Sequence, residues 1–75
     1  MAAARHLRKR SFQLAGHRTS VALEPEFWTV LDAAARRQGL SLAALVTAID
    51  TTREAAAHPL ASALRLHALA EASRR

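Results

Sequence analysis

Cations are the most numerous ionisable side chains in this sequence, and a cluster of them lies near its N-terminus. Eleven of the 75 residues are Lys or Arg and six are Asp or Glu, which gives a formal net charge of +5. Five cations precede the first acid, Glu24: Arg5, Arg8, Lys9, Arg10 and Arg18. Cations clustered beside a folded core favour a polyanionic partner, most simply nucleic acid. Two other interpretations stay open, a solvated tail and an Arg- and Ala-rich mitochondrial transit peptide.

No residue pattern in the sequence indicates catalysis or metal binding. The histidines are dispersed, and no pair of them lies at a metal-ligand spacing with a carboxylate in register: they are His6, His17, His58 and His67. The sequence has no cysteine, and it lacks a Gly-rich phosphate loop, a nucleophile elbow and a pair of catalytic carboxylates. We therefore expect a protein that is not an enzyme and that uses neither a metal nor another cofactor.

A short alternating segment supplies a second set of side chains that could contact a ligand. Between residues 18 and 23, polar or small residues alternate with apolar ones, which is typical of a strand with one buried face. The outward positions are Arg18, Ser20 and Ala22, and Val21 and Leu23 point inward. A lone strand leaves its backbone N–H and C=O groups unpaired, and the rest of the sequence offers no comparable second strand. We therefore predict pairing with the same strand of a second copy of the chain.

Residues 1–16 are interpreted as a basic N-terminal arm. The first ten residues show no sustained apolar period. Within residues 11–15, Phe12 and Leu14 alternate with polar side chains, which predicts a short strand there or an extension of the main strand. Gly16 then permits a kink or a bulge. Whether residues 11–15 extend the ribbon or belong to the arm stays open.

Two helices are predicted directly after the strand. Pro25 suits the first position of a helix and Gly39 suits its end, which predicts a helix over residues 25–38. Ser41 suits the N-cap of a second helix, over residues 41–52. An apolar face follows both helices and joins the inward strand residues in the predicted dimer core: Val21, Leu23, Phe27, Trp28, Leu31, Leu45, Val46 and Ile49.

A third helix is predicted over residues 58–72, after His58 and Pro59. Its apolar coverage is wide, so we expect it to pack on the dimer or on another protein. A chain of 75 residues buries little apolar surface, which again favours oligomerisation. The sequence has neither an apolar run of membrane-spanning length nor a secretory signal. We therefore expect a cytoplasmic protein, associated with the nucleoid and with no membrane.

The segment from Arg18 to Asp50 resembles the ribbon-helix-helix superfamily, the fold of the Arc, MetJ and plasmid copy-number repressors. The resemblance rests on the alternating strand, on a helix that opens beside an acid or proline, and on Gly39-Leu40-Ser41 followed by Leu45-Val46. Residues 15–28 are also similar to a bacterial subgroup that carries an extra C-terminal helix. The resemblance implies a mainly α-helical homodimer with one β-strand per chain. The two strands would form an intermolecular antiparallel ribbon, and the third helix would be added to this core.

The resemblance also implies a function. It implies a bacterial, sequence-specific DNA-binding protein, a transcriptional repressor or regulator, whose ribbon enters the major groove of double-stranded DNA. Its base-contacting residues would be Arg18, Ser20 and Ala22, although Ala22 departs from the polar residue common at that position. Its phosphate-contacting residues would be Ser41, Leu42, Arg5, Arg8, Lys9 and Arg10.

Two alternatives to a repressor stay open. One is the antitoxin of a toxin-antitoxin pair, in which helix 58–72 binds the protein partner. The other is a protein-interaction or scaffold module that keeps the dimer core without binding DNA, an interpretation favoured by Ala22.

Overall fold

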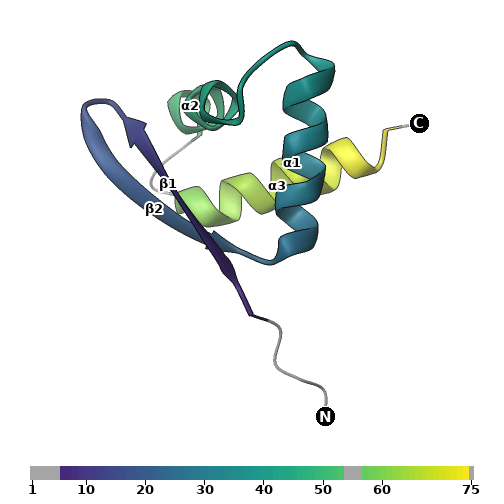
Figure 1. Cartoon of the computed structure of the whole chain (residues 1–75), viewed down its shortest axis with the longest axis horizontal. Coiled ribbons are helices and arrows are strands. Elements are labelled where there is room, and N and C mark those ends of the chain that lie inside the picture. Colours follow the sequence, from purple (N-terminus) through teal and green to yellow (C-terminus); the bar gives the residue numbers. More distant parts are fainter. Residues whose placement is uncertain (1–5, 54–56, 75) are drawn as a thin grey trace.

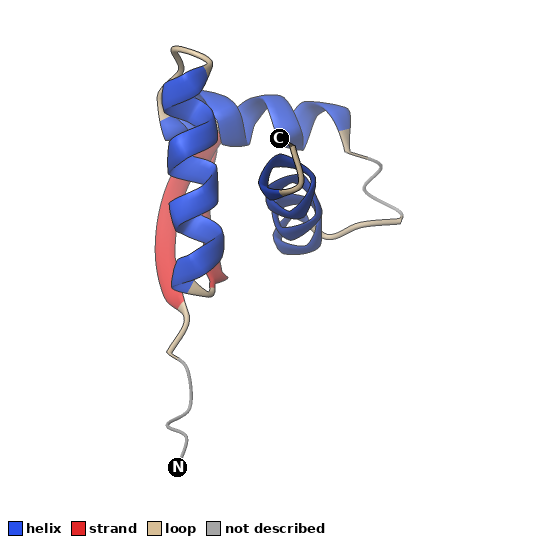
Figure 2. Cartoon of the chain, turned by 90° about the vertical axis from the view of Figure 1, so that its right-hand side faces the viewer, coloured by secondary structure: helices blue, strands red, loops and turns tan. Residues whose placement is uncertain are grey.

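A β-hairpin and three helices make up the part of the chain that the computed structural model describes, residues 6–53 and 57–74 (Figure 1). The elements follow in the order β1 (Arg8–Leu14), β2 (His17–Leu23), α1 (Pro25–Arg37), α2 (Leu42–Thr52) and α3 (Leu60–Ala72). The helices run in different directions, since α2 is viewed nearly end on in Figure 1 and α3 nearly end on in Figure 2. None of the described helices is long and apolar enough to cross a membrane.

The strand at residues 17–23 finds its partner within the same chain. β1 pairs with β2 in antiparallel register, from Arg8 opposite Leu23 to Leu14 opposite His17. The sequence predicted a basic arm over residues 1–16, with at most a short strand at 11–15 within it, and a partner strand from a second copy. The structure instead continues β1 back through the basic residues 8–10 and closes a two-stranded sheet inside one chain.

The loop between the strands explains this difference. Ala15 and Gly16 both have positive φ angles, 51° and 83°, and they are the two residues between the paired positions Leu14 and His17. Positive φ at both central residues is the requirement of a type I′ turn, whose twist matches that of two paired strands. Gly16 therefore supports a tight hairpin turn, where the sequence suggested a kink in an extended arm.

The helices cover one face of the hairpin and enclose a core with it. Phe12, Leu14, Val21 and Leu23 are buried on this face of the hairpin. The helices contribute the other buried core residues: Trp28, Leu31, Ala34, Ala35, Leu45, Val46, Ile49, Leu60, Leu64 and Ala68. The residues predicted for a dimer core are thus buried within a single chain, apart from Phe27, which is partly buried against the core.

The third helix completes this core. α3 packs against α1, α2 and β2, and its residues Leu60, Leu64 and Ala68 are buried. Pro59 is the N-cap of α3, so the helix begins at Leu60, two residues after the predicted start. The sequence predicted packing on the dimer or on another protein, and the structure places α3 against the core of its own chain.

Capping residues fix the turn between α1 and α2. The C-cap of α1 is Gln38, and Gly39 follows it with a φ of 73°. Ser41 is the N-cap of α2, and its Oγ accepts a hydrogen bond of 3.0 Å from the backbone N–H of Ala44. A hydroxyl at this position satisfies one of the free N–H groups at a helix start.

Candidate nucleic-acid interface

The face of the hairpin that points away from the core is polar and exposed to solvent. Side chains of directly opposite residues project from the same face of a sheet. The register therefore places three cross-strand pairs on this face, which we name the outer face: Lys9 with Ala22, Ser11 with Ser20, and Gln13 with Arg18. Five of these side chains are exposed and Ala22 is half-buried. The outer face has a cation at each end and no acidic residue.

A hydrogen bond occupies the middle of the outer face. The hydroxyl oxygens of Ser11 and Ser20 lie 2.8 Å apart, one donating to the other. A hydroxyl has one donor hydrogen and two acceptor lone pairs, so each serine of the pair keeps capacity for a ligand. The bond also ties the two strands together at the centre of the surface that would meet a partner.

The end of the outer face nearest the turn carries its most versatile pair. Gln13 lies opposite Arg18, and both side chains are exposed. The Gln amide supplies donors and an acceptor, whereas the Arg guanidinium supplies only donors, in a rigid planar fork. This pair can therefore present a mixed hydrogen-bonding pattern over the width of two strands.

The N-terminal cations do not act as one group. Arg10 lies opposite Val21 and projects toward the helices, where its Nη1 lies 3.2 Å from Oδ1 of Asp32. The guanidinium carbon of Arg10 also lies 4.9 Å from the centroid of the Trp28 ring, in cation–π geometry. Arg10 therefore holds β1 against α1.

The other predicted phosphate contacts are also dispersed. Arg8 is exposed and lies opposite Leu23, at the open end of the hairpin and on the face opposite to the outer face. Lys9 belongs to the outer face, and Arg5 lies outside the described residues. Ser41 and Leu42 lie at the start of α2, after the turn from α1, and are not among the strand residues of the outer face.

The family model for a ribbon-helix-helix domain matches residues 7–72. The chain belongs to the ribbon-helix-helix family. The suspected resemblance is confirmed, and the matched range takes in both strands of the hairpin and the whole of α3. Ribbon-helix-helix domains are generally DNA-binding regulators or antitoxins, and they typically bind DNA as dimers. No match was found among curated proteins or among solved structures.

The sequence predicted the residues that β2 contributes to the outer face of this ribbon-helix-helix domain, but not those that β1 contributes. The predicted base-contacting residues Arg18, Ser20 and Ala22 do lie together on it, all from β2. Its β1 half, namely Lys9, Ser11 and Gln13, was not predicted to share this face with them. The signal was present, because alternate residues from 9 to 13 are polar while Phe12 and Leu14 are apolar. An arginine at the inward position 10 concealed this alternation.

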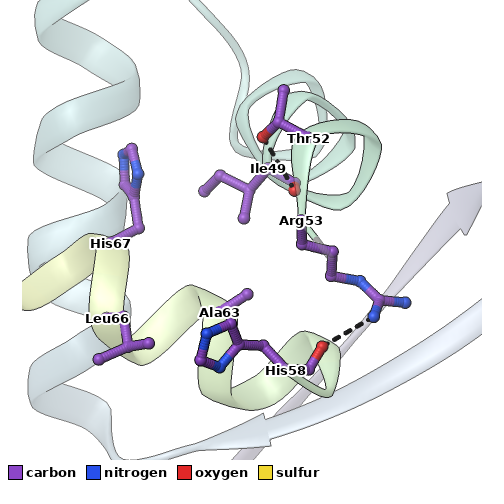
Figure 3. Close-up of a pocket in the computed structure, with 7 residues that line it drawn as sticks. All are labelled: Ile49, Thr52, Arg53, His58, Ala63, Leu66 and His67. Atoms are coloured by element: carbon purple, nitrogen blue, oxygen red, sulfur yellow. Dashed lines mark hydrogen bonds between the residues drawn. The ribbon is translucent and has the colours of Figure 1, made fainter. Parts of the chain in front are cut away.

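A pocket of about 400 Å³ lies at a different place in the ribbon-helix-helix domain, between the C-terminal end of α2 and α3 (Figure 3). Its lining combines apolar, histidine and other polar side chains: Ile49, Thr52, Arg53, His58, Ala63, Leu66 and His67. Arg53 Nε donates to Oδ1 of Asp50 and its Nη1 donates to the carbonyl of His58, both at 2.9 Å. These internal bonds engage the guanidinium, and within residues 6–53 and 57–74 no three His, Asp or Glu side chains gather as metal ligands.

Proposed function

We propose that this protein is a sequence-specific DNA-binding regulator that inserts the outer face of its hairpin into the major groove. The observation that carries the proposal is the composition of that face, which is polar, exposed and free of acids, with Lys9 and Arg18 at opposite ends. A two-stranded ribbon fits the width of the major groove, where each base pair offers a distinct pattern of donors and acceptors. Arg18 and Ser20 are the proposed base contacts on β2, and Ala22 offers an apolar contact to a thymine methyl.

Contacts to phosphate would fix the ribbon in the groove. We assign these contacts to Lys9, to the exposed Arg8, to Arg5, and to the N–H groups at the start of α2 around Ser41 and Leu42. Arg10 is the exception among the cations, because Asp32 and Trp28 already engage its guanidinium. For Arg10 we propose a structural role in place of a phosphate contact.

The size of the outer face supports action as a homodimer. From residue 9 to residue 13 a strand rises about 14 Å, at about 3.4 Å per residue. That length corresponds to about four base pairs at about 3.4 Å each. Four base pairs recur too often in a genome to define a target, so a second copy must extend the site. We propose a bacterial, cytoplasmic repressor that acts on nucleoid DNA by occupying an operator.

The test is selection of binding sites from a randomised duplex library at near-physiological salt. The expected result is an enriched motif, bound by the wild-type protein, in which Arg18→Ala loses the preference at the position that Arg18 contacts. Arg36→Ala is the matched control, because Arg36 is an exposed arginine in the last turn of α1, away from the outer face. Binding without a motif that disappears as the salt concentration rises would contradict the proposal and favour the scaffold module.

Protein binding through α3, as in an antitoxin, is the second candidate. The observation that favours it is the exposure of Leu66 and Leu69, which are 50% and 54% exposed on a helix whose other leucines are buried. An antitoxin would co-purify with a defined partner chain and would lose it in Leu66→Asp or Leu69→Asp. DNA binding by the hairpin should survive both substitutions.

A further inference from the structure

We infer that β1 contacts DNA bases as well as β2, and that Gln13 and Arg18 together contact two neighbouring base pairs. Each chain therefore recognises a short DNA sequence, which we name its element. This element has a direction, because it has no internal two-fold symmetry. This inference rests on the proposed DNA-binding function and specifies how that function is carried out. It follows from the pairing of the hairpin within one chain, which gives the outer face two different strands.

The Gln13–Arg18 pair has the chemistry and the spacing for two adjacent bases. The Cβ atoms of directly opposite residues in an antiparallel pair lie about 4.5–5.5 Å apart, which is close enough for flexible side chains to reach base pairs stacked about 3.4 Å apart. A glutamine can bond both N6 and N7 of adenine, and an arginine can bond both O6 and N7 of guanine. The pair therefore fits a step that contains an adenine and a guanine.

Both side chains of the pair are available for these contacts. Gln13 and Arg18 are exposed, and across the described residues neither side chain is engaged in an internal hydrogen bond or ion pair. Arg10 provides the contrast, because its guanidinium is held by Asp32 and lies over Trp28. The polar groups of Gln13 and Arg18 are thus free to contact a ligand, whereas the guanidinium of Arg10 is engaged by other residues of the chain.

The outer face is asymmetric from end to end. In a ribbon built from two copies of one strand, a two-fold axis would place identical side chains at equivalent positions of both strands. In this hairpin only the central pair, Ser11 with Ser20, is chemically alike. The end near the turn carries Gln13 and Arg18, whereas the open end carries Lys9 and Ala22. Lys9 is a point charge and Ala22 has no polar side-chain group, so discrimination between bases concentrates at the turn.

The element that each chain recognises stays asymmetric when two copies bind DNA together. Two copies on DNA would supply two directional elements, each of about four base pairs given the rise of a strand. Any two-fold symmetry of the complete site would then relate one element to the other, and it would not pass through the centre of an element. The two-fold axis of the DNA site would pass between two elements for an intrachain ribbon and through the centre of an element for an intermolecular ribbon. The position of this axis therefore distinguishes the two kinds of ribbon.

The experiment compares library selections with the full-length wild-type protein, Gln13→Ala and Arg18→Ala. Gln38→Ala is the matched control, because Gln38 is an exposed glutamine at the C-cap of α1. For the wild-type protein we expect elements without internal two-fold symmetry. In Gln13→Ala we expect discrimination at one base position to fall roughly tenfold or more, with other positions kept. Arg18→Ala should lose discrimination at the neighbouring position, and Gln38→Ala should reproduce the wild-type motif.

The outcomes distinguish this inference from the proposed function. A motif that depends on Arg18 but is unchanged in Gln13→Ala would overturn the role of β1 and leave the DNA-binding proposal standing. A two-fold axis at the centre of each element would overturn the inferred asymmetry of the element and would likewise leave the DNA-binding proposal standing. The absence of any motif from the wild-type selection would overturn both. The melting temperature of Gln13→Ala should equal that of the wild type, which excludes unfolding as the cause of a lost contact.

Discussion

The indole Nε1 of Trp28 donates a hydrogen bond of 2.7 Å to the backbone carbonyl of Arg8, and this bond fastens β1 to α1. Trp28 is only 2% exposed, and its ring lies 6.0 Å from that of Phe12, measured between centroids. Arg10 covers the same ring with its guanidinium. A single side chain of α1 thus contacts three alternate positions of the first strand, which places half of the outer face.

Trp28→Phe should therefore destabilise the protein and loosen β1 in particular. The substitution keeps an aromatic ring but removes the N–H donor, which leaves the Arg8 carbonyl without this partner and the core with unfilled volume. We expect a loss of about 1–3 kcal/mol in the free energy of unfolding. Urea denaturation measures this loss, and amide hydrogen exchange should be fastest in β1. Equal exchange rates in β1 and α1 would contradict the anchoring role.

The turn residue Ala15 offers a stabilising substitution. Ala15 has a φ of 51°, in the left-handed region that costs a residue with a β-carbon roughly 1–2 kcal/mol. Asn tolerates this region better, and Asn-Gly is the preferred sequence of a type I′ turn. Ala15→Asn should raise the free energy of unfolding by about 0.5–1 kcal/mol, since only part of the strain is relieved.

Gly16→Ala is the opposing control for the turn. Gly16 has a φ of 83°, and a β-carbon there would meet no atom within 4 Å, so its cost would come from the backbone alone. We expect a loss of about 1–2 kcal/mol. Thermal unfolding of both variants checks the pair. A lower melting temperature for Ala15→Asn would show that the loop has a different conformation from the one described.

The helices and the hairpin differ in how far the sequence could predict them. Pro25, Gly39 and Ser41 mark helix ends through local backbone chemistry, and the helices begin and end within two residues of the predicted positions. β1 depends instead on contacts distant in sequence. Arg10 occupies an inward position only because Asp32 and Trp28, far along the chain, engage its guanidinium. No periodicity within residues 1–16 contains that information.

The sequence predicted the part of the candidate site that lies on β2, but not the part that lies on β1. Arg18 and Ser20 were found because their own strand alternates clearly between polar and apolar residues. Gln13 was not predicted on the outer face because its position opposite Arg18 depends on the hairpin register. Most residues predicted for a dimer core are buried within one chain, together with Leu64 and Ala68 of α3. Helical periodicity gave the third helix an apolar side, but it could not say which chain that side covers.

Leu64→Ala tests whether α3 belongs to the folding unit. Leu64 is fully buried, and truncating such a leucine costs about 2–5 kcal/mol because it removes apolar contact and leaves a cavity. A domain of this size has little stability to spare, so the variant should be largely unfolded at moderate urea concentrations. Leu66→Ala, on the same helix but half exposed, should cost less than about 1 kcal/mol. Similar losses in both variants would place α3 outside the core.

Lys9→Ala should weaken DNA binding, whereas Arg10→Ala should lower stability. Lys9 lies on the outer face, so its loss should weaken binding to all DNA sequences and reduce the slope of log K against log salt by about 0.9. Arg10 is engaged with Asp32 and Trp28, so its loss should cost up to about 1 kcal/mol of stability and leave the salt slope unchanged. Fluorescence anisotropy at several salt concentrations measures the slope. A reduced slope of log K against log salt in Arg10→Ala would show that Arg10 contacts DNA.

Strand pairing within one chain predicts a specific pattern of proton contacts. Phe12 lies opposite Thr19 and Ser11 opposite Ser20, so NOEs between these residues should arise inside a single molecule. In a sample of equal parts labelled and unlabelled protein, unfolded and refolded together, an isotope-filtered experiment records only contacts between different molecules. The strand contacts should be absent from the filtered spectrum and strong in the unfiltered one. Because a dimer of intact hairpins would still show filtered contacts elsewhere, the method separates dimerisation from strand exchange. Filtered NOEs between Phe12 and Thr19 would show that the ribbon is shared between two chains.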